Sequence, residues 1–449
     1  MQNLIRRRVQ LKSRINGLSP ISVLPTEVLT YIFRLAITKE AAFVRGKTTP
    51  LLLGGVCNKW RSIAWSTPLL WNKLTLRVSS KSSCWRPDLL HYWLLRAGTS
   101  PLYISVDAEH ETESTLSIIK DIVIVLMTRS EYWRSVDFLL PRSCHDMLKD
   151  VPLPIIKRVV LRPPMCTISA FNNPPPMFTA APELREVELF RYEVFATFLP
   201  WVQLQHFKSQ SMTIRNFLQL LQVSSNLEIC DIDNIYFSDV PYPSSPLSHQ
   251  SLRRLNVGIG KRKALVFLDH VAFPALRDLK VSYYDGDEDS DSFTQTVASL
   301  IRRSKCDLYS LDISKYFAGD NLIPILQAIP SLRHLCLGTW LTRKNSGQQA
   351  VRALTADLLR RLTPDYDSLG SLLLPNLKSL VYQGIIPDDC QYPLVDFLRS
   401  RSKSITRLLS IKLLQDQCCS HLREQLHQLL ADGIRVEYFV SVPQLTDFY

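Results

Sequence analysis

The stretch Leu252-Arg-Arg-Leu-Asn-Val257 shows the pattern that decides the fold of this chain. An apolar residue is followed by two mostly polar residues, a second apolar residue, one further residue and a third apolar residue. The pattern recurs at 133–138, 156–161, 184–189, 227–232, 276–281, 308–313, 332–337, 377–382 and 408–413, with a weaker copy at 204–207. Apolar residues that alternate in this way predict a short strand with one buried face. The chain is therefore expected to contain a long series of short strands.

The spacing of these strands indicates a repeat array. Up to residue 276 consecutive copies start 20–28 residues apart, and later copies start 24–45 residues apart. This period is similar to that of leucine-rich repeats, which range over ~20–29 residues and pair a strand with a helical segment. Apolar stretches at 217–223 and 322–328 lie between strands and predict such helices. The predicted fold class is α/β, with a small N-terminal helical bundle followed by an irregular leucine-rich-repeat solenoid.

The N-terminal part of the chain has a different pattern. Residues 1–20 predict a basic helix that Gly17 and Pro20 end. Apolar residues at helical spacing predict a second helix behind Pro25 and a third over 51–65. A turn at 66–70 then leads into Trp71 and a strand. A bundle of this size buries little apolar surface alone and is expected to be marginally stable by itself.

The same segment resembles an F-box. The residues that carry the resemblance are Leu24-Pro-Thr-Glu27, Val28-Leu29, Ile32-Phe33, Val56-Cys57-Asn-Lys-Trp60 and Leu70-Trp71. The stretch from Trp60 to Trp71, with Trp93-Leu-Leu-Arg-Ala-Gly98 after it, is similar to the expanded F-box-like family of basidiomycete fungi. Two features depart from the compact F-box. A polar insertion at 37–50 separates the helices, and Gly54-Gly55 lies inside the third helix, where each glycine costs about 1 kcal/mol relative to alanine.

The resemblance implies a mechanism without catalysis by this chain. F-box modules bind the Skp-type adaptor of SCF-type (cullin–RING) ubiquitin ligases, and the rest of the chain recruits the protein to be ubiquitinated. The residues expected to dock on the adaptor are Leu24, Pro25, Leu29, Ile32, Val56, Cys57, Trp60, Leu70 and Trp71. A large apolar side chain gains roughly 1.5–3 kcal/mol on full burial. The alternative is that these side chains pack only against the first repeats of their own chain.

Four regions are predicted from these patterns. They are a basic N-terminal helix at 1–20, an F-box-like domain at 21–76, a linking helix and strand region that caps the solenoid at 77–125, and the leucine-rich-repeat solenoid at 126–449. The segments 341–372 and 383–404 are expected to be insertions or helices on one face of the solenoid. Binding specificity of repeat arrays is often found in such insertions.

Composition sets the broad class of the protein. The chain is 46% hydrophobic and 21% charged, which is typical of a folded soluble protein. It has no run of about 18 apolar residues and no apolar core of a secretory signal near Met1, so a cytoplasmic or nuclear location, or both, is expected. The net charge is +12, but the basic residues are spread along the chain without interleaved aromatics. Neither a nucleic acid nor a membrane is therefore expected as a partner.

Motifs for chemistry are missing from the sequence. It contains no glycine-rich phosphate loop, no nucleophile elbow and no His-Glu-x-x-His, so no enzyme activity, cofactor or metal is expected. The ten cysteines are scattered and are interpreted as buried apolar residues. The acidic stretch 285–291 lacks the closing glutamate of an EF-hand loop. It is interpreted as a solvated loop between repeats in preference to a calcium site, with a contact for a basic partner as the minor alternative.

Two other functions remain open at this point. The first is a protein-interaction scaffold, in which the repeats bind a partner without any coupling to a ubiquitin ligase. The second is a hydrolase or transferase hidden in the irregular repeats. An enzyme of that kind would need a cluster of titratable side chains in one pocket, and the sequence shows no such cluster.

Overall fold

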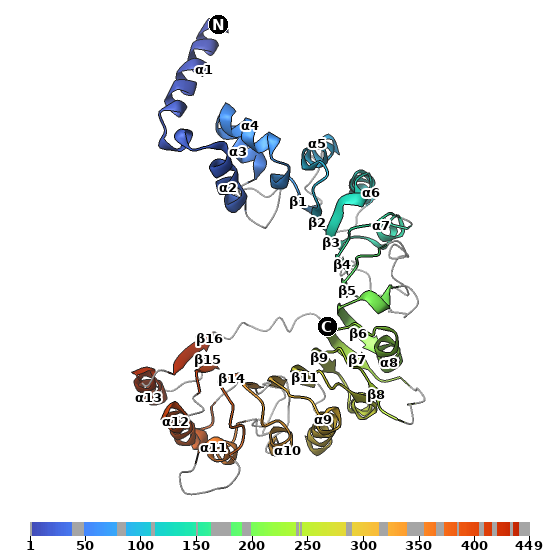
Figure 1. Ribbon diagram of the computed structural model, residues 1–449, viewed down its shortest axis with the longest axis vertical. Coiled ribbons are helices and arrows are strands. Elements are labelled where there is room, and N and C mark those ends of the chain that lie inside the picture. Colours follow the sequence, from blue (N-terminus) through green and yellow to red (C-terminus); the bar gives the residue numbers. More distant parts are fainter. Residues whose placement is uncertain are drawn as a thin grey trace. The chain divides into compact units, whose positions relative to one another are not determined.

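The computed structural model describes residues 2–37, 49–78, 87–108, 113–149, 151–162, 181–190, 199–238, 242, 245–283, 290–313, 322–338, 354–364, 372–383, 386–403, 408–414, 420–431 and 434–439. The chain forms two compact units, unit 1 (Met1–Pro200) and unit 2 (Trp201–Tyr449). Figure 1 labels their helices and strands. Most of the predicted insertion at 37–50 and of the acidic stretch at 285–291 lies outside the described residues.

Unit 1 begins with short helices. They are α1 (Gln2–Gly17), η1 (Pro20–Val23), α2 (Thr26–Ala36), α3 (Pro50–Val56), α4 (Asn58–Ser66) and η2 (Pro68–Leu70). The helices predicted over 1–20 and behind Pro25 are confirmed. The prediction of one helix over 51–65 is wrong, because the chain is extended at Cys57, with φ −157° and ψ 171°. The Trp60 backbone N–H donates to Cys57 Sγ at 3.5 Å, so Cys57 ends α3 and caps α4. We call residues 20–70 the N-terminal module.

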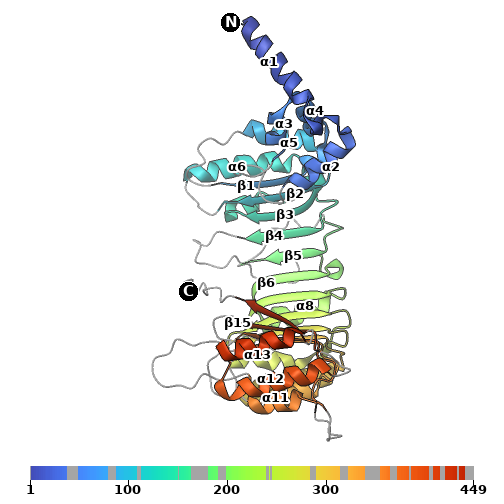
Figure 2. The ribbon, with the colours of Figure 1, turned by 90° about the vertical axis from the view of Figure 1, so that its left-hand side faces the viewer.

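A parallel sheet follows the N-terminal module within unit 1. Its strands are β1 (Lys73–Arg77), β2 (Leu102–Asp107), β3 (Trp133–Leu139), β4 (Arg158–Arg162) and β5 (Glu186–Leu189), and they pair in chain order. The described helical segments between them are α5 (Pro87–Ala97), α6 (Glu113–Met127), η3 (Ser130–Tyr132) and α7 (Arg142–Asp146). Figure 2 shows β1 to β5 stacked one after another. The repeat array thus starts at Lys73, and β2 and α5 of the predicted linking region belong to it.

Unit 2 repeats the same arrangement. Its parallel strands are β6 (His206–Thr213), β7 (Ile229–Tyr236), β9 (Arg254–Ile259), β11 (Asp278–Tyr283), β12 (Ser310–Ile313), β13 (His334–Gly338), β14 (Ser379–Gln383), β15 (Ser410–Leu414) and β16 (Arg435–Phe439). A separate two-stranded pair joins β8 (Leu247–Ser248) to β10 (Val271–Ala272). This order confirms the predicted α/β class and a repeat-like solenoid of strand and helix units.

Helical segments alternate with the strands of unit 2. They are η6 (Trp201–Gln203), α8 (Ile214–Val223), η7 (Arg262–His270), α9 (Ser290–Ser304), α10 (Ile323–Gln327), α11 (Ala356–Leu362), α12 (Asp388–Lys403) and α13 (Ser420–Ala431). The helices predicted at 217–223 and 322–328 correspond to α8 and α10. Figure 1 shows α9 to α13 along one side of the strands. The opposite side of the strands carries the alternate, mostly half-buried positions.

The apolar positions of the repeated pattern form the core. Leu252, Leu255 and Val257 of one copy are each 0% exposed, and the equivalent residues of the other copies are buried as well. Successive residues of a strand point to opposite sides, so these side chains all face the helices. Each repeat buries its apolar face against its neighbours, so the stacked repeats share one continuous core along each unit.

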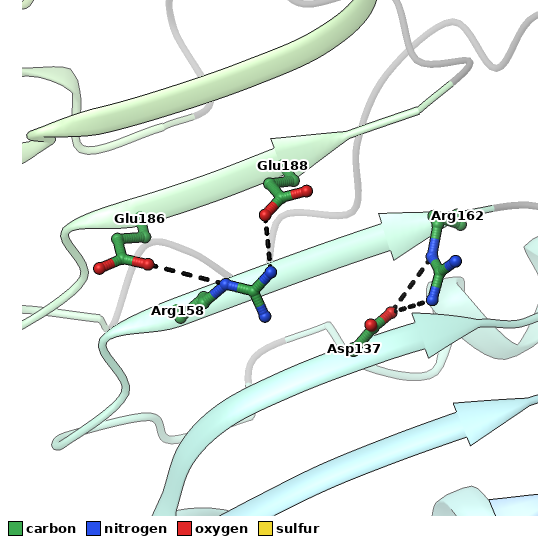
Figure 3. A network of polar contacts seen from close by, with 5 residues as sticks. All are labelled: Asp137, Arg158, Arg162, Glu186 and Glu188. Carbon is green, nitrogen blue, oxygen red and sulfur yellow. Dashed lines mark hydrogen bonds and ion pairs between the residues drawn. The ribbon is translucent and has the colours of Figure 1, made fainter. Parts of the chain in front are cut away.

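On the side of the unit 1 strands that faces away from the helices, charged side chains of neighbouring strands form ion pairs. Figure 3 shows Arg162 bound to Asp137, with 2.6 Å between Nη2 and Oδ1, and Arg158 between two glutamates. Arg158 Nη2 lies 2.6 Å from Glu188 Oε1, and its Nε lies 3.6 Å from Glu186 Oε2. These side chains are 25–41% exposed, and ion pairs of this kind contribute about 0–1 kcal/mol each. They align strands but add little stability.

Two further predictions can be compared with the described residues. Three cysteines, Cys144, Cys230 and Cys390, are buried, whereas Cys57, Cys306 and Cys336 are half-buried. The remaining four cysteines lie outside the described residues. Within the described part of the chain, no helix has the length and apolar character needed to cross a membrane.

Candidate functional site

The nine residues predicted to dock on an adaptor divide into three groups by exposure. Three of them are buried: Leu29, Leu70 and Trp71. Four are half-buried: Leu24, Ile32, Cys57 and Trp60. Two are exposed: Pro25 and Val56. The structure therefore places all nine in or directly beside the N-terminal module, but it presents only some of them to a partner.

Helix α2 has an apolar stripe that faces away from the core of the module. Val28, Tyr31 and Leu35 are 42%, 61% and 69% exposed, and their spacing of three and four residues puts them on one face of the helix. Leu29 and Phe33, on the other face, are at most 1% exposed. Exposed apolar groups gathered in this way are typical of a surface that another protein covers.

Helix α3 adds a second exposed apolar pair. Leu52 is 57% exposed and Val56 is 55% exposed, one helical turn apart. Thr49 begins the helix, because its Oγ1 accepts a hydrogen bond from the Leu52 backbone N–H at 3.3 Å. Leu53 and Gly54 turn inward and are buried. We call the five residues Val28, Tyr31, Leu35, Leu52 and Val56 the apolar surface.

The corner at Leu24 and Pro25 is held in place by a lysine from α4. Lys59 Nζ donates to the backbone oxygen of Ser22 at 2.7 Å and to that of Leu24 at 3.2 Å. Phe33 and Trp60 bring α2 and α4 together, with ring centroids 4.8 Å apart. The corner and α2 are thus fixed relative to α4, so the module presents a preformed surface.

Close packing against Trp65 explains one of the two glycines in this region, Gly54. A Cβ atom on Gly54 would lie 1.7 Å from Trp65 Cζ3, so no larger residue fits without displacing the indole. Arg61 Nε also donates to the Gly54 backbone oxygen at 2.9 Å, which ties α3 to α4. Gly55, by contrast, has no atom within 4 Å of the equivalent position. Close packing of two helices therefore requires Gly54 but not Gly55.

We expect opposite effects from replacing the two glycines. Gly54→Ala forces Trp65 to move and should lower the free energy of unfolding of unit 1 by about 1–3 kcal/mol. Gly55→Ala meets no atom and improves helix propensity, so it should leave stability unchanged or raise it by up to about 1 kcal/mol. Urea unfolding of both variants measures the difference. Equal stability of the two would contradict the packing seen around Trp65.

Trp71 lies in an aromatic cluster that joins the N-terminal module to the first repeat. Its Nε1 donates to the Ala64 backbone oxygen at 2.7 Å, and Trp93 Nε1 donates to the Trp71 backbone oxygen at 2.7 Å. Its ring packs edge-on against Trp93, 4.7 Å between centroids, and against Trp65, 5.4 Å. Trp71 is 2% exposed. In this structure it supports the module from within and does not face a partner, and the same holds for Leu29 and Leu70.

Within the described residues, no group of three or more His, Cys, Asp or Glu side chains is arranged to hold a metal ion. Tyr31 was not among the residues predicted from the sequence, although its spacing from Val28 and Leu35 was visible. The sequence does not show which side of α2 faces the rest of the module. Only that orientation decides which stripe of the helix is exposed.

Comparison with known proteins adds little. No family model matches the chain, and no curated protein matches it. Among solved structures, a protein of Bacteroides fragilis is similar, with 15% sequence identity and a TM-score of 0.23, over 78% of this chain and 69% of that chain. A likeness of this size carries no argument about the function of this chain.

Proposed function

We propose that this chain is a non-catalytic substrate-recognition subunit of an SCF-type (cullin–RING) ubiquitin ligase. The N-terminal module docks on the Skp-type adaptor, and the repeat array binds the protein to be ubiquitinated. The observation that carries the proposal is the apolar surface of the module, five apolar side chains of α2 and α3 that are 42–69% exposed. Such side chains gain stability only when a partner covers them.

The order of residues along the chain supports the same proposal. The exposed Pro25 and half-buried Leu24 lie in the segment that resembles the opening of an F-box, and Val56 and Trp60 lie in the segment that resembles its second half. The strand and helix repeats that follow form an extended protein-binding scaffold, as solenoids commonly do. Docking at one end and recognition along the array need no catalytic group in this chain.

A second candidate function is a repeat scaffold without coupling to a ligase. The observation that favours it is the burial of Trp71, Leu70 and Leu29, which pack inside unit 1 and are not available to an adaptor in this structure. The two candidates differ in one property, namely adaptor binding by the apolar surface. That property can be measured directly.

The test is direct binding of the full chain to a Skp-type adaptor. We expect the wild-type chain to bind, and we expect Leu35→Arg and Leu52→Arg each to weaken binding at least about tenfold, because each puts a charge into the buried centre of the contact. Both side chains are more than half exposed, so neither change should disturb the fold. Binding is measured by isothermal titration calorimetry.

The matched control is Leu95→Arg on α5, which is 45% exposed and lies outside the module. It introduces the same charge and should leave adaptor binding unchanged. If the wild-type chain does not bind the adaptor, the ligase proposal fails and the scaffold is favoured. The same conclusion follows if Leu95→Arg reduces binding as much as the two module variants.

A further inference from the structure

Five side chains, four of them basic, form a row across five neighbouring strands of unit 2, each at the residue directly before its strand. The row consists of Arg253, Arg277, Tyr309, Arg333 and Lys378, which precede β9, β11, β12, β13 and β14, and all five are exposed. We call it the basic row. In the sequence these residues are separated by 24–45 positions, so their proximity depends on the fold.

Backbone hydrogen bonds hold the row in register. The Arg277 N–H donates to the Arg253 oxygen at 2.8 Å, and the Tyr309 N–H donates to the Arg277 oxygen at 2.7 Å. The Arg333 N–H donates to the Tyr309 oxygen at 2.9 Å, and the Lys378 N–H to the Arg333 oxygen at 2.8 Å. Neighbouring strands lie about 4.8 Å apart, so the row spans about 19 Å.

The charge of the row is largely uncompensated. Arg253 has one acidic neighbour, with 3.8 Å between its Nη1 and Glu228 Oε2. Among the described residues, Arg277, Arg333 and Lys378 form no ion pair with a carboxylate. On the strands themselves the basic side chains are paired with carboxylates. Arg254 Nη2 lies 3.4 Å from Asp278 Oδ2, and Lys280 Nζ lies 2.9 Å from Asp312 Oδ2. The row therefore differs from the strand face beside it.

The centre of the row is structured. The Arg333 guanidinium lies over the Tyr309 ring, 5.2 Å from its centroid, and the other neighbour of Tyr309 is His334, with centroids 4.9 Å apart. Burial lowers the pKa of His334, and the charges of Arg333 and Lys378 lower it further against the opposing effect of Asp278. A guanidinium that lies over an aromatic ring can still present its N–H groups to a planar carboxylate.

We propose that the basic row binds an acidic polypeptide segment of the recruited protein, laid in extended conformation across the strands of unit 2. An extended chain advances about 3.3 Å per residue, so about six residues cover the row. This inference rests on the proposed function, because it assigns a chemical class to the protein that the repeats recruit. Aspartate and glutamate side chains of such a segment complement Arg277, Arg333 and Lys378.

A nucleic acid is the less suitable occupant. Proteins that hold single strands combine basic grooves with several aromatic platforms on which bases stack. The basic row has one aromatic residue, and Arg333 and His334 already contact its ring. The row thus offers charge without stacking surfaces, which suits carboxylates.

The test uses the full chain and a labelled peptide of six glutamates, with a peptide of six glutamines and an oligothymidylate of matching charge as comparisons. We expect the glutamate peptide to bind, the glutamine peptide not to bind, and binding to weaken as salt is raised. The triple variant R277E/R333E/K378E should weaken glutamate binding at least about tenfold, and R333Q/K378Q should weaken it by less. Fluorescence anisotropy measures each.

The matched control is K261E/K263E/R302E, which changes the net charge of the chain equally through exposed residues of η7, α9 and the residue before η7. It should keep at least half of the binding affinity. The inference is overturned if the wild-type chain does not bind the glutamate peptide, if the control loses binding as the triple variant does, or if the oligothymidylate binds more tightly. Adaptor binding, measured on the same triple variant, should not change, so failure here is distinguishable from failure of the proposed function.

Discussion

Trp71→Ala is expected to lower the free energy of unfolding of unit 1 by about 3–5 kcal/mol. The indole is 2% exposed and fills the space between Trp65 and Trp93, so its removal leaves a cavity. The Ala64 backbone oxygen also loses the donor that lies 2.7 Å from it. Trp71→Phe keeps most of the ring but not the N–H, and should cost about 1–3 kcal/mol. Urea unfolding followed by circular dichroism measures both.

The control for Trp71 is Tyr92→Ala on α5. Tyr92 is an aromatic residue of similar size, one position before Trp93, but it is 58% exposed. Its replacement should change stability by no more than about 0.5 kcal/mol. If Tyr92→Ala and Trp71→Ala were equally stable, the aromatic cluster would not join the N-terminal module to the first repeat.

Arg401→Met is expected to have the second large effect, a loss of at least about 3 kcal/mol from unit 2. The Arg401 side chain is buried in α12 and binds four backbone oxygens of the α11 to β14 connection. Nε donates to Leu362 at 3.0 Å, Nη1 to Pro375 at 3.2 Å, and Nη2 to Leu373 at 3.0 Å and Leu374 at 3.1 Å. Methionine has a similar volume but leaves these oxygens without their donors, at about 1–3 kcal/mol each before relaxation.

The buried guanidinium remains charged under ordinary conditions. Burial lowers the pKa of Arg401 to about 10, which is still well above neutral pH. Arg399→Met, two residues earlier on the same helix, is the matched control, because the Arg399 side chain is 52% exposed and its Nη1 lies 3.7 Å from Asp396 Oδ1. We expect a change of less than about 1 kcal/mol there. Comparable losses in both variants would contradict a structural role for the Arg401 hydrogen bonds.

Much of the fold follows from the sequence because its strands carry a local pattern. Each predicted copy corresponds to an observed strand, usually with the first leucine two residues before the strand begins. Leu252 precedes β9 and Leu332 precedes β13 in this way, and both are buried. The last strand, β16, was not predicted, since 434–439 follows the pattern only in part. Periodicity therefore fixed which residues face the helices.

The candidate site was less predictable because exposure depends on tertiary contacts. Val28 and Leu29 are adjacent apolar residues on one helix, yet Val28 is 42% exposed and Leu29 is 0% exposed. Similarly, Gly54 was expected only to weaken a helix, whereas the structure shows that Trp65 occupies the space of any larger side chain. The basic row was hidden for a further reason: its members become neighbours only once the strand register is known.

The pairing of β13 with β14 has a consequence for how chains of this architecture can diverge. His334 lies opposite Ser379 and Leu335 opposite Leu380, although residues 339–378 separate the two strands. Lengthening a connection costs only about 0.6 kcal/mol for each doubling. Insertions and deletions before α11, and so outside the segment that Arg401 binds, are therefore expected to leave the strand pairing unchanged. Related genes could exchange this first part of the connection for one of another length and acquire a different binding preference while every strand keeps its partner.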